Sequence, residues 1–182
     1  GAELLLAATT LSAGSLTNAG KVTVIGNDSH VEAAASISGN WQMNAGRLFI
    51  EGTQRIGTLT VNGGILTGQG TLTIDALSFN AGTLTNPSFQ TGSRLNVLGS
   101  TSFDGSSNQQ IGNSAQLHLL GNSTWTAGNG RLIVDSAYSA GSSNYASAVL
   151  HIGAGTTFTD QGAASSSGFK VLGGGTVHND GT

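Results

Sequence analysis

The sequence has little of what most soluble domains are built from. It contains no cysteine, which excludes a disulfide framework and a cysteine-based zinc site. Charged residues make up 8% of the chain, against roughly 25% in an ordinary domain, and the net charge is −3. With no basic run, we expect neither a nucleic-acid partner nor recruitment to an anionic membrane. No apolar stretch reaches the ~18 residues of a membrane span, so we expect no membrane insertion of this segment.

Helix-forming glutamate and lysine are also scarce. Threonine, valine and isoleucine recur instead at alternate positions, and 29 glycines, together with Asn, Asp and Ser, stand between these stretches. This pattern is typical of short strands joined by turns. We therefore expect one all-β domain over residues 1–182. Because the chain starts with Gly rather than Met, we expect it to be a segment of a longer repetitive protein.

A short phrase recurs along the chain: a small loop that ends mostly in Gly or Ser, a polar residue, then an apolar–polar–apolar triplet. It is found at residues 20–24, 46–50, 70–74, 93–97, 115–119 and 130–134. Its leading apolar residues are Val22, Leu48, Leu72, Leu95, Leu117 and Leu132. Six or seven residues earlier stands a second apolar column: Leu16, Trp41, Leu66, Phe89, Ile111 and Trp125. Repeats of this length indicate a solenoid.

The two columns drift together along the chain, and a looser apolar cluster stands between each pair of column residues and the next pair. This predicts a single-stranded parallel β-helix, right-handed, with three short strands in each coil of about 22–26 residues. The regular coils cover about residues 9–135. Residues 136–182 are irregular, with loops expected at 138–144 and 163–168. Strand positions without an assigned register follow there: Leu150, Phe158, Val171 and Val177.

Charged residues occupy fixed places in the repeat. Cations stand before the leading apolar residue, on the outward side: Lys21, Arg47, Arg94, Arg131 and Lys170. Acidic residues stand at strand ends: Glu51, Asp75 and Asp135. We interpret the cations as solvated surface residues rather than a ligand-binding stripe, and the acids as turn residues rather than a calcium ladder or catalytic pair. The sequence therefore predicts no catalytic residue, no metal and no cofactor, and leaves the ligand-binding residues open.

Histidines and aromatics are the remaining candidates for a site. His118, His151 and His178 each follow an apolar residue and should point outward, but the first two are separated by more than one predicted coil. We therefore predict separate surface histidines rather than a shared metal site. Trp41 and Trp125 stand between polar neighbours, which predicts core positions rather than sugar-stacking platforms. An outward Phe49 would be a contact residue.

Five Thr-x-Thr pairs also recur, and in-register threonines on a solenoid can order water and bind ice. The pairs start at Thr58, Thr71, Thr83, Thr124 and Thr157. They occupy different places in the predicted repeat. We therefore attribute them to β-propensity, with ice binding as a third hypothesis.

The phrases at residues 57–64, 70–74 and 80–86 resemble the β-strand repeats of bacterial autotransporter passengers and of filamentous-haemagglutinin-type adhesins. The resemblance covers residues 9–135 and is one of repeat pattern, without site residues to transfer. It implies a secreted right-handed β-helix at a bacterial surface, used as a stalk or adhesive fibre.

Together these features predict a non-enzymatic structural or adhesive segment at the bacterial cell surface or outside the cell. Its expected partners are glycans or proteins of a host or neighbouring cell, or other copies of itself, bound through repeated weak contacts. The alternative is an extracellular β-helix that binds or cleaves polysaccharides, for which exposed aromatics and converging carboxylates would be needed.

Overall fold

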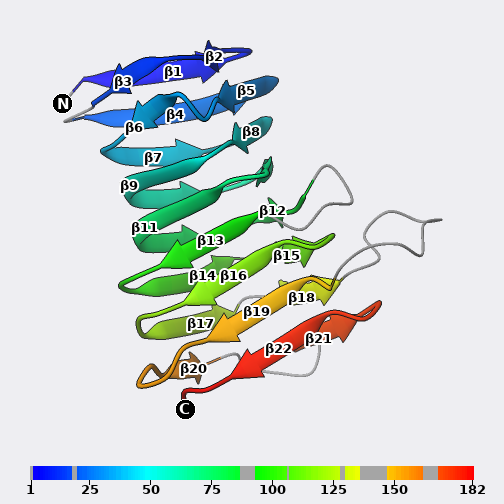
Figure 1. Ribbon diagram of the computed structural model, residues 1–182. Helices are drawn as coiled ribbons and strands as arrows, with labels where there is room; N and C mark the ends of the chain where they lie inside the picture. The colour runs from blue at the N-terminus through cyan, green and yellow to red at the C-terminus, as the bar shows by residue number, and fades with distance from the viewer. Residues whose placement is uncertain are drawn as a thin grey trace.

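The computed structural model describes residues 2–17, 20–86, 93–105, 107–127, 130–135, 147–161 and 168–182. Within these ranges every regular element is a β-strand, and every strand pairing is parallel. The strands stack from the N-terminal to the C-terminal end of one axis (Figure 1). The predicted all-β parallel solenoid is confirmed.

The strands form three faces. Face 1 consists of β1 (Glu3–Ala7), β4 (Lys21–Gly26), β7 (Asn40–Met43), the second halves of β9 (Thr53–Val61) and β11 (Thr71–Phe79), β14 (Thr101–Gly105), β17 (Ser123–Ala127) and β20 (Phe158–Asp160). Face 2 consists of β3 (Gly14–Leu16), β6 (Ala35–Ile37), the first halves of β9 and β11, β13 (Arg94–Val97), β16 (Gln116–Leu119), β19 (Val149–Ile152) and β22 (Thr176–Asn179). Face 3 consists of β2 (Thr10–Leu11), β5 (Asp28–Val31), β8 (Arg47–Ile50), β10 (Ile65–Gly68), β12 (Gly82–Leu84), β15 (Gln109–Gly112), β18 (Arg131–Asp135) and β21 (Gly168–Leu172).

Two nine-residue strands join faces 1 and 2. The first half of β11 pairs with β13, whereas its second half pairs with β14, and β9 runs beside both halves. One 12-stranded sheet therefore covers both faces apart from β3 and β6, which form a two-stranded sheet of their own on face 2. An 8-stranded sheet forms face 3 in the described part of the chain. The chain visits faces 1, 3 and 2 in turn, which gives the predicted three strands per coil.

The length of the first coils corrects the predicted columns. Val22 stacks on Trp41, and Leu48 stacks on Leu66, so these coils are shorter than predicted. Coils of the predicted length begin only at Leu72, which stacks on Leu95. The prediction that Val22, Leu48 and Leu72 form one column is wrong. Each strand alternates in the same way on every face, so the recurring phrase does not reveal the face to which it belongs.

The later members of both columns need the same correction. Leu117 continues the column of Leu95, but Leu132 lies on face 3 beside Gln109. Trp125 stacks on Phe103 on face 1, not in the column of Leu66. Phe89, a predicted member of that column, lies outside the described residues, as does the predicted loop at 138–144.

The inward residues of all three faces form one core. Trp41 and Trp125 are 1% and 2% exposed, which confirms their predicted core positions. Leu48, Leu72 and Leu95 are also buried. Each such aliphatic side chain contributes roughly 1.5–3 kcal/mol on full burial. The stack is therefore stabilised mainly by apolar contacts between successive coils.

An asparagine ladder marks the corner between faces 1 and 3. Asn80 Nδ2 donates to Asn62 Oδ1 at 2.8 Å, and Asn62 Nδ2 donates to Asn44 Oδ1 at 2.9 Å. Two residues after each asparagine stands a glycine with positive φ. A Cβ on Gly64 would lie 2.5 Å from the carbonyl oxygen of Gly46. Asparagine and glycine at this corner thus allow consecutive turns to approach closely.

Gln54 joins the first coils to the rest of face 2. Its side chain is 3% exposed and lies in an inward position. Nε2 donates to the carbonyl of Ala35 at 2.9 Å, and Oε1 accepts from the amide of Ile37 at 3.3 Å. The amide side chain therefore satisfies the edge of β6, which otherwise pairs only with β3 in the described residues.

The structure assigns the register after residue 135 that the sequence left open. Leu150 stacks on Leu117, and Val177 stacks on Leu150. Val171 stacks on Val134 on face 3. Phe158 lies beside Ser123 on face 1. The predicted loop at 163–168 lies outside the described residues up to Gly168, where β21 begins.

Candidate functional site

Three histidines form a row on face 2. His118, His151 and His178 occupy equivalent positions of β16, β19 and β22 and pair in register. The prediction that they lie apart is wrong. Neighbouring histidines are 33 and 27 residues apart along the chain, more than the predicted coil length, yet they lie on adjacent strands. We call these residues the histidine row.

The rings of the histidine row are in close contact. Nδ1 of His118 lies 3.2 Å from Nδ1 of His151. The two ring centroids are 5.0 Å apart, with an interplanar angle of 83°. The ring of His178 is 6.1 Å from that of His151, with an angle of 80°. Successive rings therefore lie nearly perpendicular to each other rather than in a parallel stack.

Polar side chains hold both ends of the closest pair. Nε2 of His151 lies 2.9 Å from Oδ2 of Asp180. Nε2 of His118 lies 3.3 Å from Oε1 of Gln116. Arg94 donates to the same Oε1 from Nε at 3.1 Å and from Nη2 at 2.9 Å, which identifies that atom as the amide oxygen. One continuous polar chain thus connects Arg94 to Asp180 across face 2.

Burial and neighbouring charges lower the pKa values of two side chains in this polar chain, His118 and Asp180. Burial lowers the pKa of His118 to about 4, and the charges of Arg94 and His151 add to the effect. The hydrogen bond with His151 lowers the pKa of the Asp180 carboxyl, with smaller contributions from the charges of His151 and His178. Near neutral pH His118 is therefore uncharged and Asp180 is ionised.

The row lines an open depression of about 360 Å³. Its lining residues are Gln116, His118, Val149, His151, His178 and Asp180. In the described ranges no group of three or more His, Cys, Asp or Glu side chains has an arrangement that could hold a metal ion. The depression is accessible to water and to small ions.

Face 1 carries a second surface feature, a column of hydroxyl side chains. Neighbouring strands bring five residues into register, which we call the hydroxyl row: Thr60, Ser78, Ser102, Thr124 and Thr159. Gln42 extends the row by one coil. The prediction that the Thr-x-Thr pairs share no register is therefore wrong for the three threonines of this row. It is correct for Thr73 and Thr83, which lie on faces 2 and 3.

The predicted cations and acids are distributed over all three faces. Lys21 lies on face 1, 3.0 Å from Glu3, and Arg47 lies on face 3, 3.7 Å from Asp28. Arg94 belongs to face 2 and contacts Gln116, as described above. They do not form one stripe, because the recurring phrase occurs on different faces.

Two of the remaining predicted side chains, Asp75 and Phe49, have partners in the structure. Asp75 accepts a hydrogen bond from Arg55 at 2.7 Å. Phe49 is half-buried and stacks on His30, with centroids 4.2 Å apart and an interplanar angle of 1°. Its outward position is confirmed, although the histidine covers one side of the ring.

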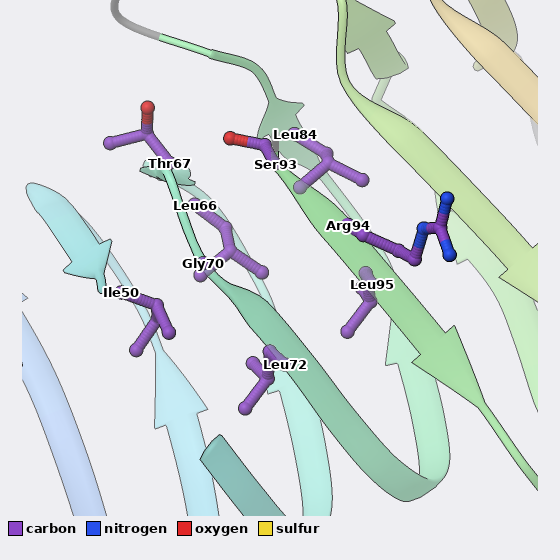
Figure 2. Close-up of a pocket in the computed structure, with 9 residues that line it drawn as sticks. All are labelled: Ile50, Leu66, Thr67, Gly70, Leu72, Leu84, Ser93, Arg94 and Leu95. Atoms are coloured by element: carbon purple, nitrogen blue, oxygen red, sulfur yellow. The ribbon is translucent and has the colours of Figure 1, made fainter. Parts of the chain in front are cut away.

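A small cavity lies at the corner between faces 2 and 3. Figure 2 shows leucines on its inner side and the hydroxyls of Thr67 and Ser93 at its outer end, with Arg94 directed away from it. The cavity has a volume of about 10 Å³, which is room for about one water molecule. Ser93 Oγ donates to the carbonyl of Gly68. We interpret this cavity as a packing gap of the core.

Comparison with protein-family models, with curated proteins and with solved structures gave no match. In the part of the chain that the structure describes, no helix has the length and apolar character needed to cross a membrane.

Proposed function

We propose that this chain is a non-enzymatic β-helix segment of a secreted or cell-surface bacterial protein, acting as a stalk and a multivalent contact surface. The hydroxyl row is the observation that carries the proposal. It places a small uncharged hydroxyl at the same outward position of five successive coils. Such a row offers donors and acceptors that are repeated along the axis.

The spacing of the row suits weak multivalent binding. Neighbouring strands of a sheet lie ~4.8 Å apart, so the hydroxyls repeat at about that interval. Further polar groups lie beside the same end of the row: the amides of Asn40 and Gln42 and the hydroxyl of Thr58. The hydroxyl of Thr58 donates to the amide oxygen of Asn40 at 2.9 Å. Each contact with a sugar hydroxyl or a peptide amide is weak, but several contacts on one rigid axis combine into useful avidity.

The location and partners in this proposal come from the resemblance to autotransporter and haemagglutinin-type repeats. The absence of cysteine suits a chain that is exported unfolded. The partners are surface glycans or proteins of a host or neighbouring cell, or further copies of the same chain. Between glycan and protein, the uncharged hydroxyl row favours neutral glycans.

Screening on an array of neutral glycans tests this role. Thr60→Val combined with Thr124→Val removes two hydroxyls of the row while keeping the shape and β-propensity of the side chains. We expect the wild-type chain to bind a subset of the array and the double variant to lose most of that signal. Thr73→Val combined with Thr83→Val makes the same change on faces 2 and 3 and should bind as the wild type does. Equal loss in both double variants would contradict a role for face 1.

Ice binding is the second candidate, because the hydroxyl row contains three threonines in register. Thermal hysteresis of the wild-type solution distinguishes the two roles. We expect none for a contact surface. A hysteresis that disappears in Thr60→Val/Thr124→Val would favour ice binding. The polysaccharide-cleaving alternative receives less support, since Trp41 and Trp125 lie in the core.

A further inference from the structure

The hydrogen bonds of the histidine row leave two nitrogen lone pairs facing each other. Asp180 is an acceptor, so Nε2 of His151 carries the hydrogen and its Nδ1 is left as an acceptor in the neutral ring. Oε1 of Gln116 is also an acceptor, so Nε2 of His118 carries the hydrogen of that ring. Both Nδ1 atoms then present lone pairs at a separation of 3.2 Å. In the neutral rings these two lone pairs repel each other at this distance, unless a proton or a metal ion lies between them.

We propose that His118 and His151 form a binding site for a divalent transition-metal ion of the class that imidazole prefers, such as Zn²⁺. The two Nδ1 atoms are the protein ligands, and water from the depression completes the coordination. The site is independent of the hydroxyl row on face 1 and of the proposed contact function.

The separation of the two nitrogens fits this assignment. Zinc binds imidazole nitrogen at about 2.0–2.1 Å with tetrahedral geometry, so two nitrogen ligands of one ion lie roughly 3.3 Å apart. The observed Nδ1–Nδ1 distance is 3.2 Å. The ion therefore fits without a change in strand register.

The surroundings orient both rings as metal ligands are oriented in other proteins. A ligating histidine usually donates its other N–H to a carboxylate or a carbonyl oxygen. Asp180 accepts this hydrogen bond from His151, and Gln116 accepts it from His118. Arg94 donates to Gln116 and holds its side chain in place. His178 lies beyond the pair, with its ring 6.1 Å from that of His151.

Calorimetric titration of the chelator-stripped full chain with Zn²⁺ tests the site. We expect saturable one-to-one binding and a rise in melting temperature. His118→Gln and His151→Gln should each abolish the binding. His30→Gln is the matched control, because His30 lies on face 3 against Phe49, and it should bind as the wild type does. Absence of saturable binding, or binding that persists in His118→Gln, would overturn the proposal.

Two further measurements separate a metal site from a structural effect. Nitrogen NMR of the imidazoles should place the Zn²⁺-induced shift on Nδ1 of His118 and His151. Asp180→Asn should lower the affinity roughly 10–100-fold, as removal of an outer partner does at other histidine sites, and leave the metal-free melt near that of the wild type. A Zn²⁺-induced shift confined to Nε2, or to His178, would contradict the assigned ligands. Unchanged affinity in Asp180→Asn would contradict the orienting role of Asp180.

Discussion

At the scale of single residues, folding strongly lowers the pKa of His118. It is half-buried on β16 and faces His151 from β19, while Arg94 from β13 lies near it through Gln116. Its folded pKa of about 4 lies below the roughly 6.5 of an unfolded histidine. The unfolded chain therefore takes up this proton at a higher pH than the folded chain does.

The sign of the pH dependence follows from that order. The contribution of His118 to stability is complete above about pH 6.5, decreases as the pH falls toward about 4, and then levels off. We expect the urea midpoint of the metal-free protein to fall over this interval and His118→Gln to fall less. Asp180 and Glu3, whose pKa values are lowered, act at more acidic pH, below about 4. Parallel curves for the wild type and His118→Gln between these limits would contradict the assignment.

The histidine row also shows what could and could not be predicted from the sequence at single residues. Alternation correctly places His118 and His151 outward, since each lies between two buried residues. Their contact could not be predicted from coil length, because 33 residues separate them and the predicted coil has about 22–26 residues. The shared context, a histidine between Leu117 and Leu119 and another between Leu150 and Ile152, was the available signal, because register is set by alternation within strands.

At the scale of elements, the asparagine ladder fixes the corner where face 1 turns into face 3. Asn62 is its central member, with one hydrogen bond to the coil on each side. Asn62→Ala removes both. Because the side chain is exposed, we expect a loss of about 1 kcal/mol in the free energy of unfolding, measured by urea denaturation.

Asn96 supplies the matched control for the ladder. It is a half-buried asparagine on face 2, and within the described residues its side chain makes no hydrogen bond in the structure. Asn96→Ala should change stability by less than about 0.5 kcal/mol. An effect of Asn96→Ala as large as that of Asn62→Ala would indicate that the ladder adds nothing beyond an ordinary surface asparagine.

The elements also explain why the fold class was predictable and the register was not. Alternating residues such as Leu72-Thr73-Ile74 fit a strand with one buried side wherever they occur in the coil. The triplet that starts at Leu48 has the same pattern but lies on face 3. Face identity depends on turn length and on corner residues such as Gly64. Gln54, a buried amide that replaces backbone pairing, carries no periodic signal at all.

At the scale of the whole molecule, the stack behaves as a one-dimensional array in which each coil contacts mainly its neighbours. Leu72 lies in the middle of that array, between Gln54 of the preceding coil and Leu95 of the following one. Its side chain is 3% exposed. Damage at this position should therefore spread in both directions along the axis, and weaken with distance.

Leu72→Asp tests this view of the molecule. An unpaired carboxylate in the core should lower the free energy of unfolding by about 3–5 kcal/mol. Thr73→Ser, one residue away on the outward side, should change it by less than about 0.5 kcal/mol. Hydrogen exchange should find the largest loss of amide protection in β9, β11 and β13, and a smaller loss in β1 and β22. Comparable thermal melts for the two variants would contradict the assigned faces, whereas uniform loss of protection would mean that the coils unfold as a single cooperative unit.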